Sequence, residues 1–305
     1  MPTPATPSSH VLDLFAVPEV VEPLPGALTD SVRAGDLVLS PGRDAAVQGW
    51  LSPLLARLAV RLDERPDRRA QDLRVAMPVP ARDGAWVVEG WAASRWEPGT
   101  TACLDPAVTL AAGRLLHARL APLVTEPPAV VLERTDARAR AERLAFAGGA
   151  DLRAAAGTLP AGAAGLVRRV ADLLDGLDPD AASPAATRHQ LVHADLAGHV
   201  LLDAAGAPVV VDVDPAWRPP LWAEAVAALD LVRGGADPAR LDRYAGAATR
   251  AALLRALLFG ALVDPAADVA AYTAVLDRLD VVDLGGHDGP PRPDPVAETE
   301  ELHRG

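Results

Sequence analysis

Residues 192–214 read "VHADLAGHVLLDAAGAPVVVDVD", and two aspartates in this stretch decide how the chain is interpreted. Asp195 lies in a His-x-Asp turn, and Asp212 ends the second of two apolar runs that flank Ala205-Gly206. Apolar runs on either side of such a turn predict a β-hairpin. Two interpretations are open: a catalytic loop followed by an aspartate that holds a metal, or two loop acids that cap turns.

The composition around this stretch excludes several classes of function. The chain has 305 residues, half of them hydrophobic, which is enough for a large core in one two-lobed unit or two domains. A net charge of −12 without a long basic block argues against a nucleic-acid partner. The apolar run 256–263 is too short to span a bilayer, and no signal pattern opens the chain. Because Cys103 is the single cysteine, no internal disulfide is expected. Together these features lead us to expect a cytoplasmic protein without a membrane partner.

The chain contains no lysine. All 29 basic residues are arginines. Any chemistry that needs a lysine amine is therefore excluded, whether a Schiff base, a P-loop lysine or a kinase-type lysine.

The order of expected elements predicts an α+β chain with two lobes. Strands surround the turns at 34–36 and 82–84, and a helix at 44–64 is expected to kink or break at Pro53. After about residue 105 the helical period dominates. A cleft between two such lobes is the natural ligand site. The expected divisions are a disordered N-terminus at 1–8, a β-rich lobe at 9–90, a hinge and helical lobe at 91–285, and a disordered tail at 286–305.

Three segments carry a resemblance to a known family: "HADLAGHVLL", "VVVDVDPAWRPP" and "WVVEGWAASRW". Together they resemble the aminoglycoside-phosphotransferase-like branch of the kinase fold, whose signature is a His-Gly-Asp loop, an Asn and a hairpin that ends in Ile-Asp. More narrowly, they resemble an uncharacterised actinobacterial subgroup with a catalytic loop one residue shorter. The resemblance covers about 9–280 and is most specific in 192–222. It implies a two-lobed, protein-kinase-like fold.

The resemblance also implies a role for each residue of the motif. Asp195 takes the place of the catalytic proton acceptor, and His193 supports its loop through backbone contacts. Asp212 takes the place of the metal-binding aspartate, with Asp214 as a further metal ligand. His199 stands where the family has its metal-binding Asn, and Mg-ATP is the implied cofactor.

The nucleotide half of the motif departs from the family pattern. Ser40 stands at the position of the phosphate-positioning lysine, and no acid lies between Asp44 and Asp63, where its usual partner belongs. At position 199 an imidazole replaces an amide and favours softer ions than magnesium. We expect Arg33, Ser40 and Trp91 at the nucleotide, with Arg33 or Arg43 able to recover part of the phosphate binding.

These departures favour a degenerate kinase-fold protein. We expect a pseudoenzyme or a very weak phosphotransferase that binds a small ligand or a partner in the cleft. The alternative is an active Mg-ATP-dependent phosphotransferase acting on a small-molecule hydroxyl. A third interpretation takes His193, Asp195 and His199 as the metal ligands of a hydrolase or oxygenase.

Overall fold

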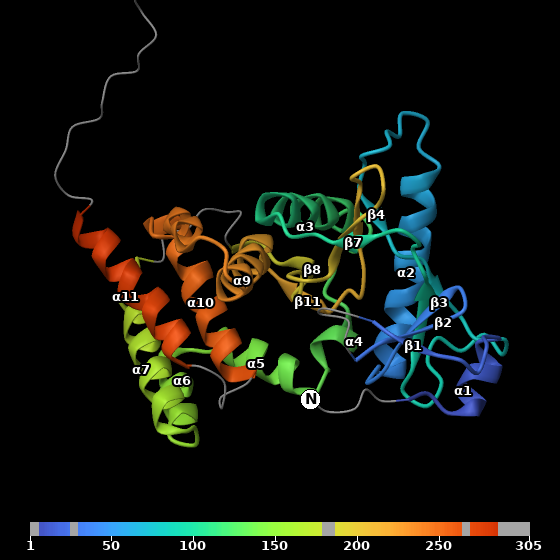
Figure 1. Ribbon diagram of the computed structural model, residues 1–305. Coiled ribbons are helices and arrows are strands. Elements are labelled where there is room, and N and C mark those ends of the chain that lie inside the picture. Colours follow the sequence, from blue (N-terminus) through green and yellow to red (C-terminus); the bar gives the residue numbers. More distant parts are fainter. Residues whose placement is uncertain (1–5, 25–29, 179–186, 264–268, 286–305) are drawn as a thin grey trace, which may run out of the picture.

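The computed structural model describes residues 6–24, 30–178, 187–263 and 269–285, and these form two lobes (Figure 1). The first lobe holds a five-stranded sheet of order β1-β2-β3-β6-β5, with helices α1 and α2 beside it. The second lobe is mainly helical. Elements of the first lobe are α1 (Ser9–Leu14), β1 (Glu22–Pro23), β2 (Val32–Ala34), β3 (Leu37–Ser40), α2 (Ala45–Asp63), β5 (Pro78–Val79) and β6 (Ala92–Arg95).

Local sequence explains the two elements that border the site. Strands β2 and β3 pair antiparallel around Gly35, whose φ of 59° is a left-handed conformation that glycine adopts without strain. Helix α2 begins where the Asp44 side chain accepts a hydrogen bond from the Val47 backbone, 2.9 Å away. The helix then continues through Pro53 as one element. Of the two outcomes expected at that residue, a kink or a break, the break is wrong.

A second sheet joins the two lobes. Its order is β4-β10-β9-β7, and β4 pairs in parallel with β10 while β7 pairs with β9. The predicted hairpin is therefore bonded on both edges to strands that lie much earlier in the chain. The four strands are β4 (Arg74–Val75), β7 (Thr101–Ala102), β9 (Val200–Leu202) and β10 (Pro208–Val210).

Helices surround a small antiparallel pair, β8 with β11, in the second lobe. One continuous core runs from Leu51 and Leu58 of α2 into Leu116, Trp222 and Leu253 of the second lobe. Helix α2 thus belongs to the second lobe's core as well as to the first lobe. The elements are α3 (Pro106–Leu120), α4 (Ala129–Leu132), α5 (Ala137–Ala145), α6 (Gly149–Ala156), α7 (Ala161–Asp175), β8 (Gln190–His193), β11 (Pro215–Arg218), α9 (Pro220–Arg233), η3 (Pro238–Tyr244), α10 (Ala247–Val263) and α11 (Val269–Gly285).

The α+β, two-lobed architecture expected from the sequence is confirmed. Strand β6 pairs with β3 and extends the first-lobe sheet to Arg95, while the division at residue 90 stays a prediction. At the N-terminus Ser8 caps α1 and bonds Glu89, so the expected disorder does not extend to that residue. Residues 1–5 and the expected tail at 286–305 lie outside the described residues. Within the described part of the chain, every helix is too short or too polar to cross a membrane.

Candidate functional site

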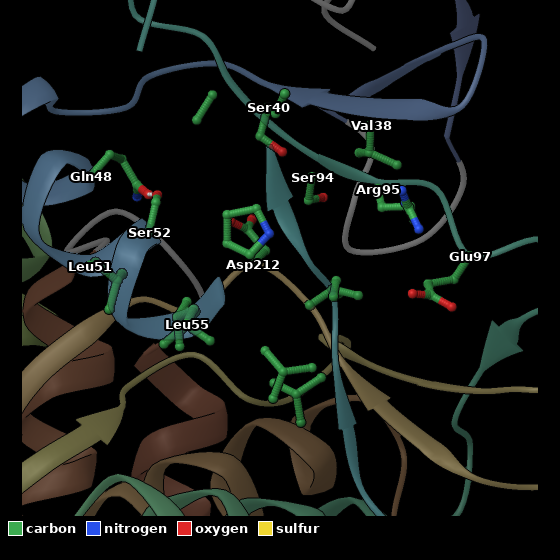
Figure 2. A pocket seen from close by; sticks show the side chains of 18 of the residues that line it. Val38, Ser40, Gln48, Leu51, Ser52, Leu55, Ser94, Arg95, Glu97 and Asp212 are labelled. Carbon is green, nitrogen blue, oxygen red and sulfur yellow. Dashed lines mark hydrogen bonds between the residues drawn. The ribbon is translucent and has the colours of Figure 1, made fainter. Parts of the chain in front are cut away.

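A cavity lies between the first-lobe sheet, helix α2 and the end of the β9–β10 hairpin (Figure 2). Its volume is about 70 Å³. An apolar cavity that admits benzene measures roughly 150 Å³, so a purine ring requires side chains here to move. The walls are mainly apolar, with polar side chains from both the sheet and α2. Its lining includes Val38, Ser40, Arg43, Gln48, Leu51, Ser52, Ala93, Ser94, Glu97, Leu201, Val211 and Asp212.

Neutral side chains occupy the positions where the family pattern has a lysine and its partner acid. Ser40, at the end of β3, lines the cavity and lies 2.9 Å from the Ser31 hydroxyl. On the facing side of α2, the Ser52 hydroxyl donates to the Gln48 side chain at 2.7 Å (Figure 2). The described wall therefore offers hydroxyl and amide groups where a kinase has an ion pair.

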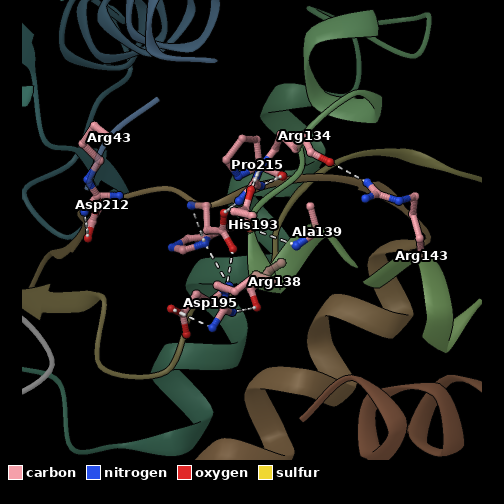
Figure 3. Close-up of polar contacts among 12 residues, drawn as sticks. Arg43, Arg134, Arg138, Ala139, Arg143, His193, Asp195, Asp212 and Pro215 are labelled. Atoms are coloured by element: carbon pink, nitrogen blue, oxygen red, sulfur yellow. Dashed lines mark hydrogen bonds and ion pairs between the residues drawn. The ribbon is translucent and has the colours of Figure 1, made fainter. Parts of the chain in front are cut away.

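Asp212 is bound by an arginine from the other lobe. Nη2 of Arg43 lies 2.5 Å from Oδ1 and 2.6 Å from Oδ2 of Asp212 (Figure 3). His199 is the next neighbour, with Nε2 at 3.7 Å from Oδ2. Asp212 has a φ of 52°, a strained conformation for a residue other than glycine, and such strain concentrates at functional sites.

Asp214 is held by two arginines of the second lobe. Arg134 Nη2 and Arg138 Nε each approach a different oxygen of this carboxylate at 2.8 Å. Burial acts to raise the pKa of the Asp214 carboxyl, but Arg138 and Arg134 hold it below its usual value. Asp214 is thus a charged, fully paired anchor.

Asp195 lies on the loop between β8 and β9. Its carboxylate is 3.4 Å from Nη1 of Arg138, which links it to Asp214 (Figure 3). Burial raises the pKa of the Asp195 carboxyl against the effect of Arg138, and repulsion from Asp214 and Asp212 adds to the rise. The three carboxylates therefore share one electrostatic environment.

His193 supports this loop through the backbone, as expected. Its Nδ1 accepts hydrogen bonds from the backbone N–H groups of Asp195 at 3.2 Å and Asp214 at 3.3 Å. The backbone N–H of His193 donates in turn to Nε2 of His117 at 3.0 Å. Burial lowers the pKa of His193 well below its usual value, so the ring is neutral and acts as an acceptor.

The residues present do not fit a magnesium ion in this arrangement. Both oxygens of Asp212 contact Arg43, and Asp214 is committed to two arginines. His199 offers nitrogen, where magnesium prefers oxygen, and its Nδ1 is buried without a hydrogen-bond partner among the described residues. Across the described ranges, no three His, Cys, Asp or Glu side chains are grouped to hold a metal, so the triad with His193 is not formed.

The other two residues expected at the nucleotide, Arg33 and Trp91, do not line this cavity. Arg33 stacks over the Trp96 ring at 5.1 Å and pairs with Glu22 at 3.4 Å. Trp91 is buried in the first-lobe core and does not line the cavity, because it packs with the sheet rather than at the hinge. Trp96, a few residues later, does line it.

The loop, the hairpin and the aspartate at its end are thus set in a cleft between a sheet lobe and a helical lobe. The chain has the two-lobed α+β architecture that the resemblance to the kinase fold implies. No family model and no curated protein matches the chain. Among solved structures, similar chains include a choline/ethanolamine kinase family protein from Mesorhizobium loti, with 20% identity, a TM-score of 0.47 and coverage of 88% of this chain and 92% of that one.

Two further solved structures are similar to this chain. Choline kinase LicA from Streptococcus pneumoniae has 15% identity and a TM-score of 0.45, over 89% of this chain and 96% of that one. The aminoglycoside phosphotransferase APH(2'')-Ib has 11% identity and a TM-score of 0.41, over 88% and 95%. It is of the class that the sequence resembles. At this identity the likeness concerns the fold alone, and the actinobacterial subgroup stays a prediction.

Sequence reasoning missed the two arginines that hold the motif. Arg134 lies in the loop before α5, and Arg138 lies in the first turn of that helix. Their carboxylate partner Asp214 lies 76 residues beyond Arg138, and only the folded chain brings them together.

Proposed function

We propose that this protein is a kinase-fold pseudoenzyme, or at most a very weak phosphotransferase, that binds a small ligand in the cleft between its lobes. One observation carries the proposal. Asp195, Asp212 and Asp214 all lie in ion pairs with arginines, while the lysine position holds Ser40. The carboxylates that would act on a proton and a metal in a kinase are here paired with arginines of the same chain.

The physics of phosphoryl transfer supports this assignment. The protein contributes mainly positioning and electrostatic stabilisation of the transferring group, so charged groups are the principal source of rate. One charged hydrogen bond contributes about 1.5–3 kcal/mol, which corresponds to about 10- to 150-fold in phosphate binding. Loss of the lysine, its acid and the amide at position 199 removes several such contacts together.

One observation favours the alternative, an active phosphotransferase that uses Mg-ATP and a small-molecule hydroxyl. Asp195 keeps the position of a proton acceptor at the cleft, and burial raises its pKa, the direction in which a carboxylate becomes a better base. Beside its loop, a cavity of about 840 Å³ lined by Ala197, Gly198 and Asp230 offers room for an acceptor.

Location and partners are part of the same proposal. We infer a cytoplasmic protein from the absence of a disulfide: Cys103 is free and buried. The net charge of −12 supports a small-molecule ligand over nucleic acid.

Thermal unfolding with and without Mg-ATP is the first test of the proposal. A ligand at 100 times its dissociation constant stabilises a protein by about 2.7 kcal/mol. We expect no magnesium-dependent rise in Tm. A clear rise favours the active alternative.

A sensitive ATP-turnover assay then separates enzyme from pseudoenzyme. The proteins compared are the wild type, Asp195→Ala and Asp212→Ala. Turnover that both substitutions abolish makes the protein an enzyme and overturns the pseudoenzyme proposal. Turnover that neither changes comes from a contaminant, and its removal is expected to leave none.

A further inference from the structure

We propose that Arg43 is the resident cation of the cleft, occupying the position at Asp212 that a divalent metal would take, so that the cleft binds its ligand without a divalent metal. This inference rests on the proposed function, since it concerns the same cleft. It goes further by assigning a role to a residue of the loop between β3 and α2, and by defining the ionic requirement of the ligand.

The position of Arg43 is fixed from both sides. Its backbone N–H donates to the Gly90 carbonyl at 2.8 Å, which ties the loop to the strand region before β6. The next residue, Asp44, caps α2 with its side chain. From this anchored backbone the guanidinium crosses to Asp212, 169 residues later, and contacts both carboxylate oxygens (Figure 3). The contact is thus built into the junction of the two lobes.

The carboxylates of the motif are already paired with guanidinium groups. Those of Asp195, Asp212 and Asp214 lie in ion pairs of 2.5 to 3.4 Å with Arg43, Arg134 and Arg138. At Asp212 itself, one positive charge already contacts both carboxylate oxygens. A divalent ion at Asp212 would have to displace Arg43. Otherwise it would share the Asp212 carboxylate with the Arg43 guanidinium, which lies less than 3 Å from that carboxylate.

The same geometry predicts what the site becomes when Arg43 is removed. Asp212 would keep the His199 imidazole as its neighbour, with Nε2 at 3.7 Å from its Oδ2. One carboxylate and one imidazole, with one unbalanced negative charge, form a partial site for a transition ion such as Mn²⁺. A latent metal site therefore lies beneath the arginine.

A ligand suited to this cleft follows from its walls. Val38, Leu201 and Val211 supply apolar surface from both lobes. Ser40 and Ser94 add neutral polar groups, and Arg95 and Glu97 add charged ones at one end. Arg43 also lines the cavity. The chemistry favours a small, mainly apolar molecule with an acceptor group directed at Arg43, rather than a polyphosphate that arrives with its own metal.

Electron paramagnetic resonance of free Mn²⁺ tests the inference without a ligand or an activity assay. Mn²⁺ is titrated into the full-length wild type, Arg43→Gln, Arg43→Met and Arg43→Gln/Asp212→Asn. Arg33→Gln is the matched control, because Arg33 is a first-lobe arginine that pairs with Glu22 outside the cavity. Thermal unfolding of each variant establishes that it is folded.

We expect Arg43→Gln and Arg43→Met to bind Mn²⁺ at least about tenfold more tightly than the wild type, the equivalent of one charged hydrogen bond. Arg33→Gln is expected to match the wild type, and the double variant to lose the gain. Wild-type binding as tight as that of the Arg43 variants, or no gain in folded Arg43 variants, overturns the inference. Because no nucleotide is present, this result is independent of the turnover assay that tests the proposed function.

Discussion

Acid is expected to destabilise this protein through a histidine that has no part in chemistry. His117 lies on α3 beneath the loop of the motif, where its Nε2 accepts the backbone N–H of His193 at 3.0 Å. Burial lowers the pKa of His117 to about 4, whereas an unfolded histidine titrates near about 6.5. Between these two values the unfolded chain binds more protons than the folded one. Stability contributed by His117 is therefore complete above the unfolded pKa and falls as the pH decreases.

The magnitude follows from the two pKa values. From about pH 7.5 to about pH 5, protonation of the unfolded state at this one site lowers the free energy of unfolding by about 2 kcal/mol. His117→Gln removes the titrating group, while its side-chain amide offers an oxygen acceptor for the His193 N–H. The variant is thus expected to lose about 2 kcal/mol less than the wild type over this interval. Carboxylates with raised pKa values, such as Asp195, act in the opposite direction, but they are common to both proteins and cancel in the difference.

Urea unfolding at the two pH values measures this difference directly. His10→Gln is the matched control, because His10 is exposed on α1, and it should follow the wild type. Equal losses for the wild type and His117→Gln would show that the buried imidazole does not resist protonation and would refute the reasoning.

Three further predictions concern stability and are checked by urea unfolding at neutral pH. His193→Leu should be less stable than His193→Asn by about 2 kcal/mol, because only Asn keeps an acceptor for the two backbone N–H groups, each contributing about 1 kcal/mol; equal stability contradicts the role of this ring. Asp44→Ala should cost about 1 kcal/mol through loss of the α2 cap, and Asp44→Ser should restore most of it. Leu116 is fully buried on α3, so Leu116→Ala should lower the free energy of unfolding by about 2–5 kcal/mol. Leu115 is half-exposed, so Leu115→Ala should stay within about 1 kcal/mol of the wild type. Similar losses for the two variants would contradict the difference in burial.

The sequence was sufficient where local rules govern. The hairpin could be predicted because Ala205-Gly206 lies between two apolar runs. In the structure Gly206 adopts a positive φ of 82°, as such a turn requires. The helix expected at 44–64 from its apolar period was found as α2, Ala45–Asp63. The break expected at Pro53 did not occur: a proline costs one backbone bond, and the buried face on either side, with Leu51 and Leu54, holds the helix together.

Tertiary pairing was beyond local rules. Arg43 was recognised as a possible substitute for the lysine, but its contact with Asp212 depends on how two lobes meet. Trp91 was expected at the nucleotide because of the family resemblance of its segment, and in the folded chain it packs inside the first lobe. The ion pairs of Arg134 and Arg138 likewise follow from packing of α5 against the motif and not from any pattern near Asp214.

The pairing of β4 with β10 has a consequence for how the chain is made. Val75 finds its strand partner Val210 only after more than two thirds of the protein has left the ribosome. Until then β4 presents an unpaired edge, and α2 lacks the second-lobe side chains that cover its apolar face. We expect a nascent chain ending near residue 178 to be protease-sensitive throughout α2, and protection of α2 to appear only when the hairpin is released. Two lobes here form one folding unit.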